Sequence, residues 1–295
     1  MMQPEHGAID EYTYRDLRIV DYTLDDAQLA TRCPLDNGRH QHQPRHSAGR
    51  VDLLSLELIA EILLELDLPT VTAFRSVNRR AMQLVDSIHE YRKLWEHCPN
   101  ILRAIISIDA RHFTCRTLYK TLSATRCDTC DRFGAYLYLI TCRRVCYFCF
   151  TRNTDYFPIS IGIATKLTTL SKREVRKLPH VVSLPGLYTA GEKASRSRTI
   201  LFDRQAIFAK ASQTHTLTQR DMTTREPRRY MSIISAPYLE ASGQLAKWGL
   251  FCVGCTESKG NEKNFRNMFT EDGIVEHINR NGFVLTHSNR HQKPS

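Results

Sequence analysis

Five of the chain's ten cysteines lie between Cys127 and Cys149, and four of them have the spacing of a metal site. Cys127 and Cys130 form one C-x-x-C pair, Cys146 and Cys149 form a second, and 15 residues separate the pairs. This spacing fits the C-x2-C-x15–20-C-x2-C template of a four-thiolate zinc site. Two facing knuckles fill the tetrahedron around zinc, so the pattern predicts a structural rather than a catalytic ion.

Clustered thiols can also form disulfides or a redox centre. The N-terminus MMQPEHGAIDEYTYRD has no basic region followed by an apolar run, so we expect no export and reduced thiols. A thioredoxin-like centre is disfavoured because no βαβ pattern surrounds either pair. Cys142 is the spare thiol, which we interpret as a small buried residue on a strand; ligand exchange with Cys146 is the weaker alternative.

A third C-x-x-C pair, Cys252 and Cys255, lies near the C-terminus, with His277 on a predicted helix and His287 beyond it. Two thiolates and two imidazoles would complete a second zinc site. The alternative is a half-formed knuckle with His277 merely exposed on its helix. Both interpretations stay open on the sequence.

Short elements must position these residues. GAYLYLIT, between the first two pairs, alternates like the strand of a zinc ribbon. We expect the metal to supply most of the folding energy of so small a unit. YMSIISAPYL and LAKWGLFC predict a hairpin leading to the third pair, and Thr270 is placed to cap the helix EDGIVEHINR, which Gly282 ends.

The region before the cysteines divides at Val51. Residues 1–50 are polar and lack an apolar period, which predicts a disordered arm. LLSLELIAEILLELDLP then shows apolar residues at helical spacing, while Glu57, Glu61 and Glu65 form a stripe that we interpret as a solvated face. These glutamates also interrupt the most apolar stretch, so we expect no membrane span.

Three short helices fit this region. Ser55 suits the first N-cap, Pro69 the start of the second helix and Asn78 the third N-cap. In the following connector, Asn100 and Thr114 are placed to cap two more helices, ILRAIISI and CRTLYKTL.

LLSLELIAEILLELDLPTVTAFRSVNRR resembles the F-box, with Ser55 where the motif usually has proline. The resemblance implies docking on a Skp-type adaptor, and through it on a cullin–RING ubiquitin ligase. The residues implied to bind the adaptor are apolar: Leu54, Leu58, Ile62, Leu63, Leu66, Pro69, Phe74 and Val77.

The resemblance extends further, to filamentous-fungal F-box proteins with a cysteine-knuckle module behind the box. KREVRKLP at 172–179, SLPGLY at 183–188 and WGLFCVGC at 248–255 stand in the order of that family. It implies a non-catalytic substrate receptor that holds a client protein through the rest of the chain, in the cytoplasm and/or nucleus.

Positive charge is concentrated in residues 166–230, which hold 14 Lys and Arg against 5 Asp and Glu, a net of +9 out of +10 for the chain. Half of this stretch has little apolar period, so we interpret it as a mobile basic linker. The alternative function is a zinc-ribbon protein that binds nucleic acid through this segment, although aromatic residues for base stacking are sparse.

The predicted fold class is α+β, with helical N-terminal parts followed by small zinc-stapled β-hairpin or ribbon elements. The predicted regions are a disordered arm (1–50), an F-box (51–92), a helical connector (93–126), a zinc-ribbon-like double knuckle (127–160), a basic, partly disordered segment (161–229), and a hairpin, third knuckle and helix (230–295).

Overall fold

The computed structural model describes residues 9–15, 20–35, 43–190, 194–211, 227–240, 245–256, 264–281, 283–284 and 291–292. Within these residues helices alternate with short antiparallel sheets, which agrees with the predicted mixed fold class. None of the described helices is both long and apolar enough to cross a membrane.

Three short helices follow residue 55: α3 (Leu56–Leu64), α4 (Leu68–Arg75) and α5 (Arg79–Ser87). The Ser55 hydroxyl accepts from Leu58 N at 3.4 Å, and the Asn78 amide oxygen accepts from Ala81 N at 2.8 Å, so both predicted N-caps are confirmed. Asp67 caps α4, and Pro69 lies in its first turn, where a missing N–H costs nothing.

The connector forms α6 (His89–His97), α7 (Pro99–Ser107) and α8 (Cys115–Ser123). The predicted Thr114 cap is confirmed by a 3.2 Å bond from Thr117 N. The predicted Asn100 cap is wrong, because α7 already begins at Pro99, whose fixed φ suits a first helical turn. The Asn100 side chain instead accepts from Arg103 at 2.8 Å.

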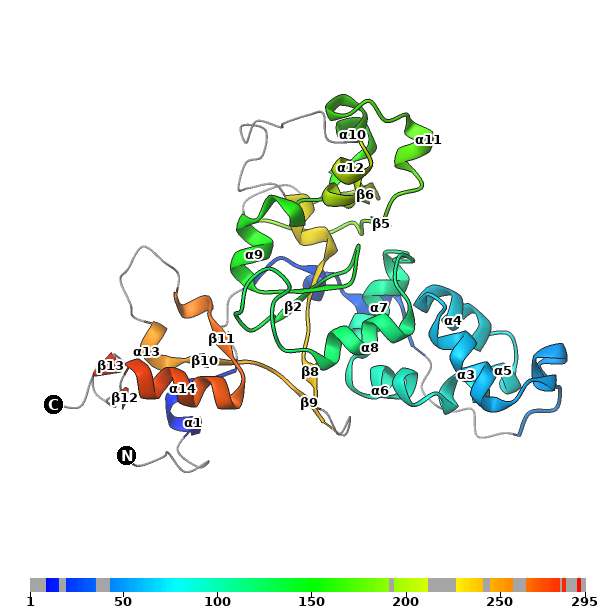
Figure 1. The fold of residues 1–295 in the computed structure, drawn as a ribbon, viewed down its shortest axis with the longest axis horizontal. Coiled ribbons are helices and arrows are strands. Elements are labelled where there is room, and N and C mark those ends of the chain that lie inside the picture. Colours follow the sequence, from blue (N-terminus) through cyan, green and yellow to red (C-terminus); the bar gives the residue numbers. More distant parts are fainter. Residues whose placement is uncertain are drawn as a thin grey trace.

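A three-stranded antiparallel sheet, in the order β3-β2-β7, lies at the centre of the molecule (Figure 1). Its strands are β2 (Tyr136–Tyr138), β3 (Arg143–Val145) and β7 (Ile233–Ser235), and α9 (Tyr147–Arg152) follows β3. Leu137 lies opposite Arg144 on one side and Ile234 on the other. The predicted strand is therefore confirmed, but β7 comes from almost 100 residues further along the chain.

One hydrophobic core runs from α3, α4 and α5 through the connector helices to this sheet. Ile59, Leu84, Ile105, Leu118 and Leu137 all belong to it and are 3% exposed or less. The double knuckle is therefore part of a large shared core and does not pack as a small separate unit. Strand β2 is the central strand of a sheet that is buried on both faces. Apolar burial therefore stabilises this strand in addition to any bound metal.

Residues 159–190 and 194–211 form a further small unit at the top of Figure 1. Its elements are β4 (Ile159–Ser160), α10 (Ile161–Leu167), α11 (Lys172–Val175), β5 (His180–Val182), β6 (Ile200–Phe202) and α12 (Arg204–Lys210), with sheet order β4-β6-β5. Ile159, Val175, Phe202 and Ile207 form its core. The linker interpretation is therefore wrong for the described residues here; residues 212–226 lie outside them.

The predicted C-terminal hairpin is confirmed only for its inner strands. β8 (Tyr238–Leu239) pairs with β9 (Ala246–Lys247), but the flanking strands go elsewhere. β10 (Leu250–Cys252) pairs with β11 (Met268–Phe269) and with the N-terminal β1 (Thr13–Tyr14). The remaining elements are α13 (Val253–Thr256), α14 (Glu271–Asn281), β12 (Phe283–Val284) and β13 (His291–Gln292). Thr270 caps α14 as predicted, through a 3.1 Å bond from Gly273 N; Gly282 lies outside the described residues.

The prediction of a disordered N-terminal arm is wrong for residues 9–15 and 20–35. They contain α1 (Ile9–Tyr12), β1, a 3-10 turn (Leu24–Asp26) and α2 (Leu29–Arg32). Leu24 is fully buried, and Asp25 accepts from both the backbone N and the hydroxyl of Ser235, at 2.9 and 2.7 Å. These segments are ordered by contacts with distant residues, which a search for local apolar periodicity does not detect.

Candidate functional site

The four predicted zinc ligands meet in one cluster. The sulfur atoms of Cys127, Cys130, Cys146 and Cys149 all lie within 4.8 Å of one another. Cys130 Sγ is 3.6 Å from both Cys146 Sγ and Cys149 Sγ, whereas a disulfide would place two sulfurs about 2 Å apart. A zinc ion with four 2.3 Å bonds to sulfur requires S···S edges of about 3.8 Å. The cluster therefore has the dimensions of a tetrahedral thiolate site and could bind a metal ion.

Tight turns present both pairs of sulfurs. Cys127 N donates to Arg132 O at 2.9 Å, which closes the first knuckle. Cys146 is the N-cap of α9, and its sulfur accepts from Cys149 N at 3.4 Å. Cys127 and Cys146 are buried, while Cys130 and Cys149 are partly exposed. A sulfur that accepts a backbone N–H is stabilised as a thiolate, the form that binds metal.

The proximity of the thiols strongly perturbs their ionisation. Hydrogen bonds from Cys146 and Cys149 lower the pKa of Cys127. The hydrogen bond to Cys127 raises the pKa of Cys146 to about 12, and the bonds to Cys127 and Cys146 raise the pKa of Cys149. One thiolate thus makes further thiolates costly, because like charges repel at this distance. A divalent cation would remove that repulsion and allow all four to ionise.

Cys142 does not belong to the cluster. Its thiol is buried beside Thr121, and burial raises its pKa to about 12. The prediction of burial is confirmed, but the placement on a strand is wrong. Cys142 lies in the turn between β2 and β3 with φ 53°, a left-handed conformation that non-glycine residues rarely adopt.

Arg144 is the residue that the sequence analysis missed in this region. It is completely buried on β3, two residues before Cys146. Its guanidinium donates to four backbone carbonyls, those of Thr121, Leu122, Gly134 and Pro237. A single side chain thus joins α8, the first knuckle and the segment after β7. Nothing in the local sequence distinguishes Arg144 from its partly exposed neighbour Arg143.

Gly134 is required by this arrangement. A Cβ atom there would overlap the Arg144 side chain and press on Cys127 N. The glycine therefore lets β3 approach the first knuckle, which brings the two pairs of cysteines together.

The second predicted cluster is partly within the described residues. Donor atoms of Cys252, Cys255 and His277 lie within 4.8 Å of one another. His287, the predicted fourth ligand, lies outside the described residues.

Large apolar side chains are exposed on and beside α3 and α4. Four of the residues predicted to bind the adaptor are exposed: Leu54 by 41%, Leu58 by 54%, Ile62 by 51% and Val77 by 69%. Leu63 and Pro69 are buried, and Leu66 and Phe74 are partly buried, so these four support the surface from beneath. Leu53 and Leu56, which the sequence analysis left out, are exposed by 82% and 57% and adjoin the first helix. We call the six exposed residues, Leu53, Leu54, Leu56, Leu58, Ile62 and Val77, the leucine face.

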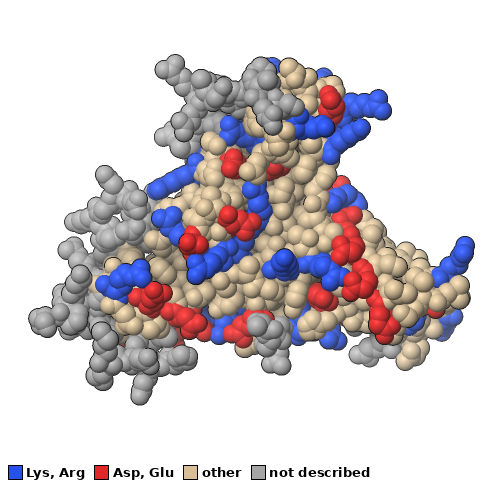
Figure 2. All heavy atoms as spheres, viewed as in Figure 1, with Lys and Arg blue, Asp and Glu red and all other residues tan. Residues whose placement is uncertain are grey.

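The glutamate stripe of α3 is exposed but not simply solvated. Glu61 and Glu65 each accept from the Arg116 guanidinium at 2.6 Å. Arg116 belongs to α8, so this exposed pair of contacts links the F-box to the connector. Figure 2 shows acidic and basic side chains next to one another over these helices.

The exposed charge of the α10–α12 unit is mainly positive. Lys172, Arg173, Arg176 and Lys177 are exposed on and beside α11, and Figure 2 shows basic side chains along the outer edge of this unit. Glu174, also on α11, is bonded to Ser171 in a capping box. This surface is suited to an anionic partner.

Comparison with known families gives one match, which covers the N-terminal helices. Residues 51–93 match the F-box domain. The match nearly coincides with the predicted 51–92. No curated protein and no solved structure matches this chain. The functional interpretation of the cysteine-rich part beyond residue 93 therefore depends on its geometry alone.

Proposed function

We propose that this chain is a substrate-receptor subunit of an SCF-type cullin–RING ubiquitin ligase. F-box domains bind Skp-type adaptors within such ligases, and residues 51–93 match the F-box domain. The observation that carries the proposal is the leucine face, since six large apolar side chains between residues 53 and 77 are exposed, and Leu58 and Ile62 among them lie one helical turn apart on α3. Exposed apolar patches of this kind mark protein interaction sites.

The proposed contribution to ubiquitin transfer is proximity. The leucine face holds the adaptor, and the remainder of the chain holds a client protein, so a client lysine is brought close to the conjugating enzyme. We assign no residue of this chain to the transfer chemistry. In this proposal the Cys127–Cys149 cluster binds a structural zinc ion. The ion stabilises the double knuckle, which lies in the core that the client-binding part shares with the N-terminal helices. We propose a cytoplasmic or nuclear location, where such ligases act.

The decisive variant is Leu58→Asp. Leu58 is half exposed, so a charge there leaves the fold intact and acts only when a partner covers it. Loss of a central apolar contact of this kind costs about 2 kcal/mol or more, roughly a 30-fold loss of affinity. Co-purification with the adaptor measures the effect.

Leu187→Asp is the matched control, because Leu187 is 45% exposed and lies outside the F-box. It should bind the adaptor at the wild-type level. A folded Leu58→Asp chain that still co-purifies with the adaptor at wild-type yield would rule out the leucine face as the docking surface.

A nucleic-acid-binding function is the second candidate, and the exposed cations of α11 are the observation that favours it. Neutralising Lys172, Arg173, Arg176 and Lys177 together should leave adaptor binding unchanged. Retention on nucleic acid should also change little at physiological salt if the chain is a receptor. A specific affinity that disappears with these four charges, and that falls steeply as salt rises, would support the second candidate instead.

A further inference from the structure

The C-terminal region contains a second group of metal-binding side chains, which comes from separate elements. Cys252 ends β10, Cys255 lies on α13, and His277 lies on α14, 22 residues later in the chain. Cys252 is 1% exposed. Their donor atoms nevertheless lie within 4.8 Å of one another. Proximity of this kind between two thiols and an imidazole needs a physical reason.

The geometry at His277 matches metal ligation. Cys255 Sγ and His277 Nε2 are 3.3 Å apart. A tetrahedral zinc ion with a 2.3 Å bond to sulfur and a 2.0–2.1 Å bond to nitrogen requires an S···N edge of about 3.6 Å. The observed separation is about 0.3 Å shorter than that edge, so a small shift of either side chain would admit the ion.

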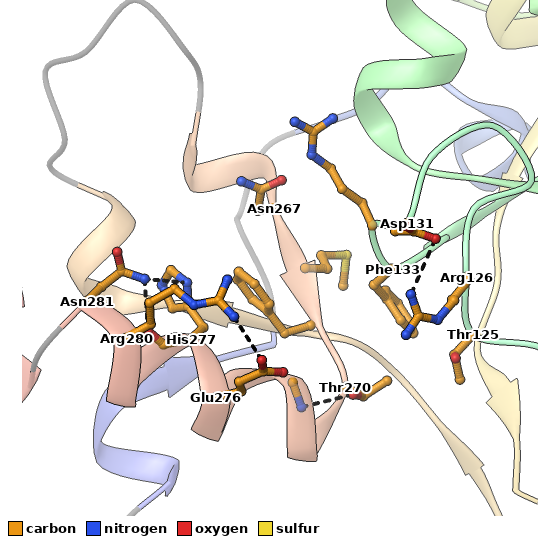
Figure 3. Close-up of a pocket in the computed structure, with 14 residues that line it drawn as sticks. Thr125, Arg126, Asp131, Phe133, Asn267, Thr270, Glu276, His277, Arg280 and Asn281 are labelled. Carbon is orange, nitrogen blue, oxygen red and sulfur yellow. Dashed lines mark hydrogen bonds and ion pairs between the residues drawn. The ribbon is translucent and has the colours of Figure 1, made fainter.

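The imidazole is also held in place from its other side. The Phe269 ring packs on the His277 ring with centroids 4.5 Å apart, and the Asn281 side-chain amide lies 3.1 Å from His277 Nδ1 (Figure 3). A histidine that binds metal through Nε2 carries its proton on Nδ1 and donates it to an acceptor. The Asn281 amide nitrogen is itself a donor, to His277 O at 2.9 Å, so ligation through Nε2 requires this amide to turn its oxygen toward Nδ1. Nε2 is the ring nitrogen next to Cys255 Sγ.

A simple cysteine–histidine pair, as in a nucleophilic enzyme, explains less of the arrangement. Such a pair needs one thiol, whereas this cluster brings a second, almost completely buried thiol to the same point. Two soft thiolates with an imidazole are the donor set that favours zinc.

We propose that Cys252, Cys255 and His277 bind a second zinc ion, with water or another ligand in the fourth position. The ion joins β10, α13 and α14, and through the pairing of Cys252 with Thr13 it also fixes the N-terminal strand β1. The proposal is independent of the receptor function, because it concerns how the C-terminal region is held together.

The second ion also fixes one wall of a cavity of about 460 Å³. Glu276, His277 and Arg280 of α14 line this wall, and Arg126 and Phe133 of the first knuckle line the opposite one (Figure 3). The two metal centres thus hold the two sides of the same cavity. Loss of the second ion should therefore loosen the cavity without disturbing the first cluster.

Metal content of the full-length chain tests the proposal, after expression with zinc and removal of loosely bound metal. The wild type should hold two equivalents of zinc. Cys255→Ser and Cys130→Ser should each hold one, and the double variant should hold none. Leu58→Asp should keep both, which separates this result from the test of adaptor binding. A wild-type chain with a single equivalent would overturn the proposal.

Two substitutions at His277 separate ligation from packing. His277→Phe keeps an aromatic ring against Phe269 but removes the donor nitrogen, so it should lose one equivalent. His277→Cys supplies a thiolate in place of the imidazole and should retain two. Cys33→Ser, at a partly exposed cysteine that is not in either group, should also retain two. A His277→Phe chain that still holds two equivalents would contradict the ligand assignment.

Discussion

Replacing Arg144 with methionine should destabilise the double knuckle by about 3 kcal/mol. Its four bonds from a charged donor to carbonyls contribute about 1.5 kcal/mol each at the low end, roughly 6 kcal/mol together. Burial opposes this, because it lowers the pKa of Arg144 from 12.5 to about 10. At about 1.4 kcal/mol per pKa unit, that cost is roughly 3 kcal/mol.

The methionine variant avoids the cost of burying a charge but leaves four carbonyls without a donor, so the difference of about 3 kcal/mol is the expected loss. With a urea dependence of about 2 kcal/mol per molar, the unfolding midpoint should fall by roughly 1.5 M. The midpoint can be followed by the release of zinc to a coloured chelator in a full-length Cys255→Ser background, which should hold only the ion of the first cluster. This signal reports on the region that Arg144 joins.

Two companion variants test the reasoning. Arg144→Lys should lose at least as much stability as Arg144→Met, because lysine keeps a buried charge and lacks the planar fork that reaches several carbonyls. Arg126→Met is the matched control: Arg126 is 73% exposed and pairs with a fully solvated Asp131, so its loss should be under about 0.5 kcal/mol. Full stability in Arg144→Lys, or equal damage from Arg126→Met, would refute the argument.

Two further predictions concern single side chains. Cys142→Ser should leave the zinc content unchanged, since Cys142 lies outside the cluster. Cys130→Ser, which should lose the zinc of the first cluster, should become protease-sensitive at residues 127–149 while α3–α5 stay folded. Limited proteolysis with mass spectrometry distinguishes these outcomes. Burial and the nearby His180 lower the pKa of His112 below its usual 6.5. The neutral His112 side chain therefore contributes fully to the stability of the fold above pH 6.5, and this contribution is lost as the pH falls through the lower pKa of the folded state. Unfolding at about pH 7.5 and pH 5 should show a smaller loss on acidification in His112→Gln than in the wild type, and equal losses would count against this role.

Much of the local structure followed from the sequence, because its causes are local. The caps at Ser55, Asn78 and Thr114 were predictable, since a cap depends on a side chain and a backbone N–H three residues away. The zinc-binding spacing of Cys127 to Cys149 was equally readable, because each knuckle is a short turn with its own hydrogen bonds. The F-box itself is a local pattern, and the family match confirms it.

The failures concern residues whose environment is set by distant parts of the chain. Strand β7 joins the knuckle sheet from far downstream, and β1 pairs with β10 across nearly the whole chain. Each of these strands is only two or three residues long, too short for a period of two to be recognised. The basic segment was mistaken for a linker because its short strands and helices bury few apolar residues each.

The sequence by itself therefore determined the chemistry that is available: a leucine-rich box, two closely spaced pairs of thiols and a basic segment. Only the tertiary structure decided how these are combined. It buried Arg144, distinguished the exposed Leu58 from the buried Leu63, and brought His277 to Cys252 and Cys255. The physical reason is that burial and the approach of donor atoms depend on long-range packing, which arises from apolar area shared among elements and leaves no regular spacing in the sequence.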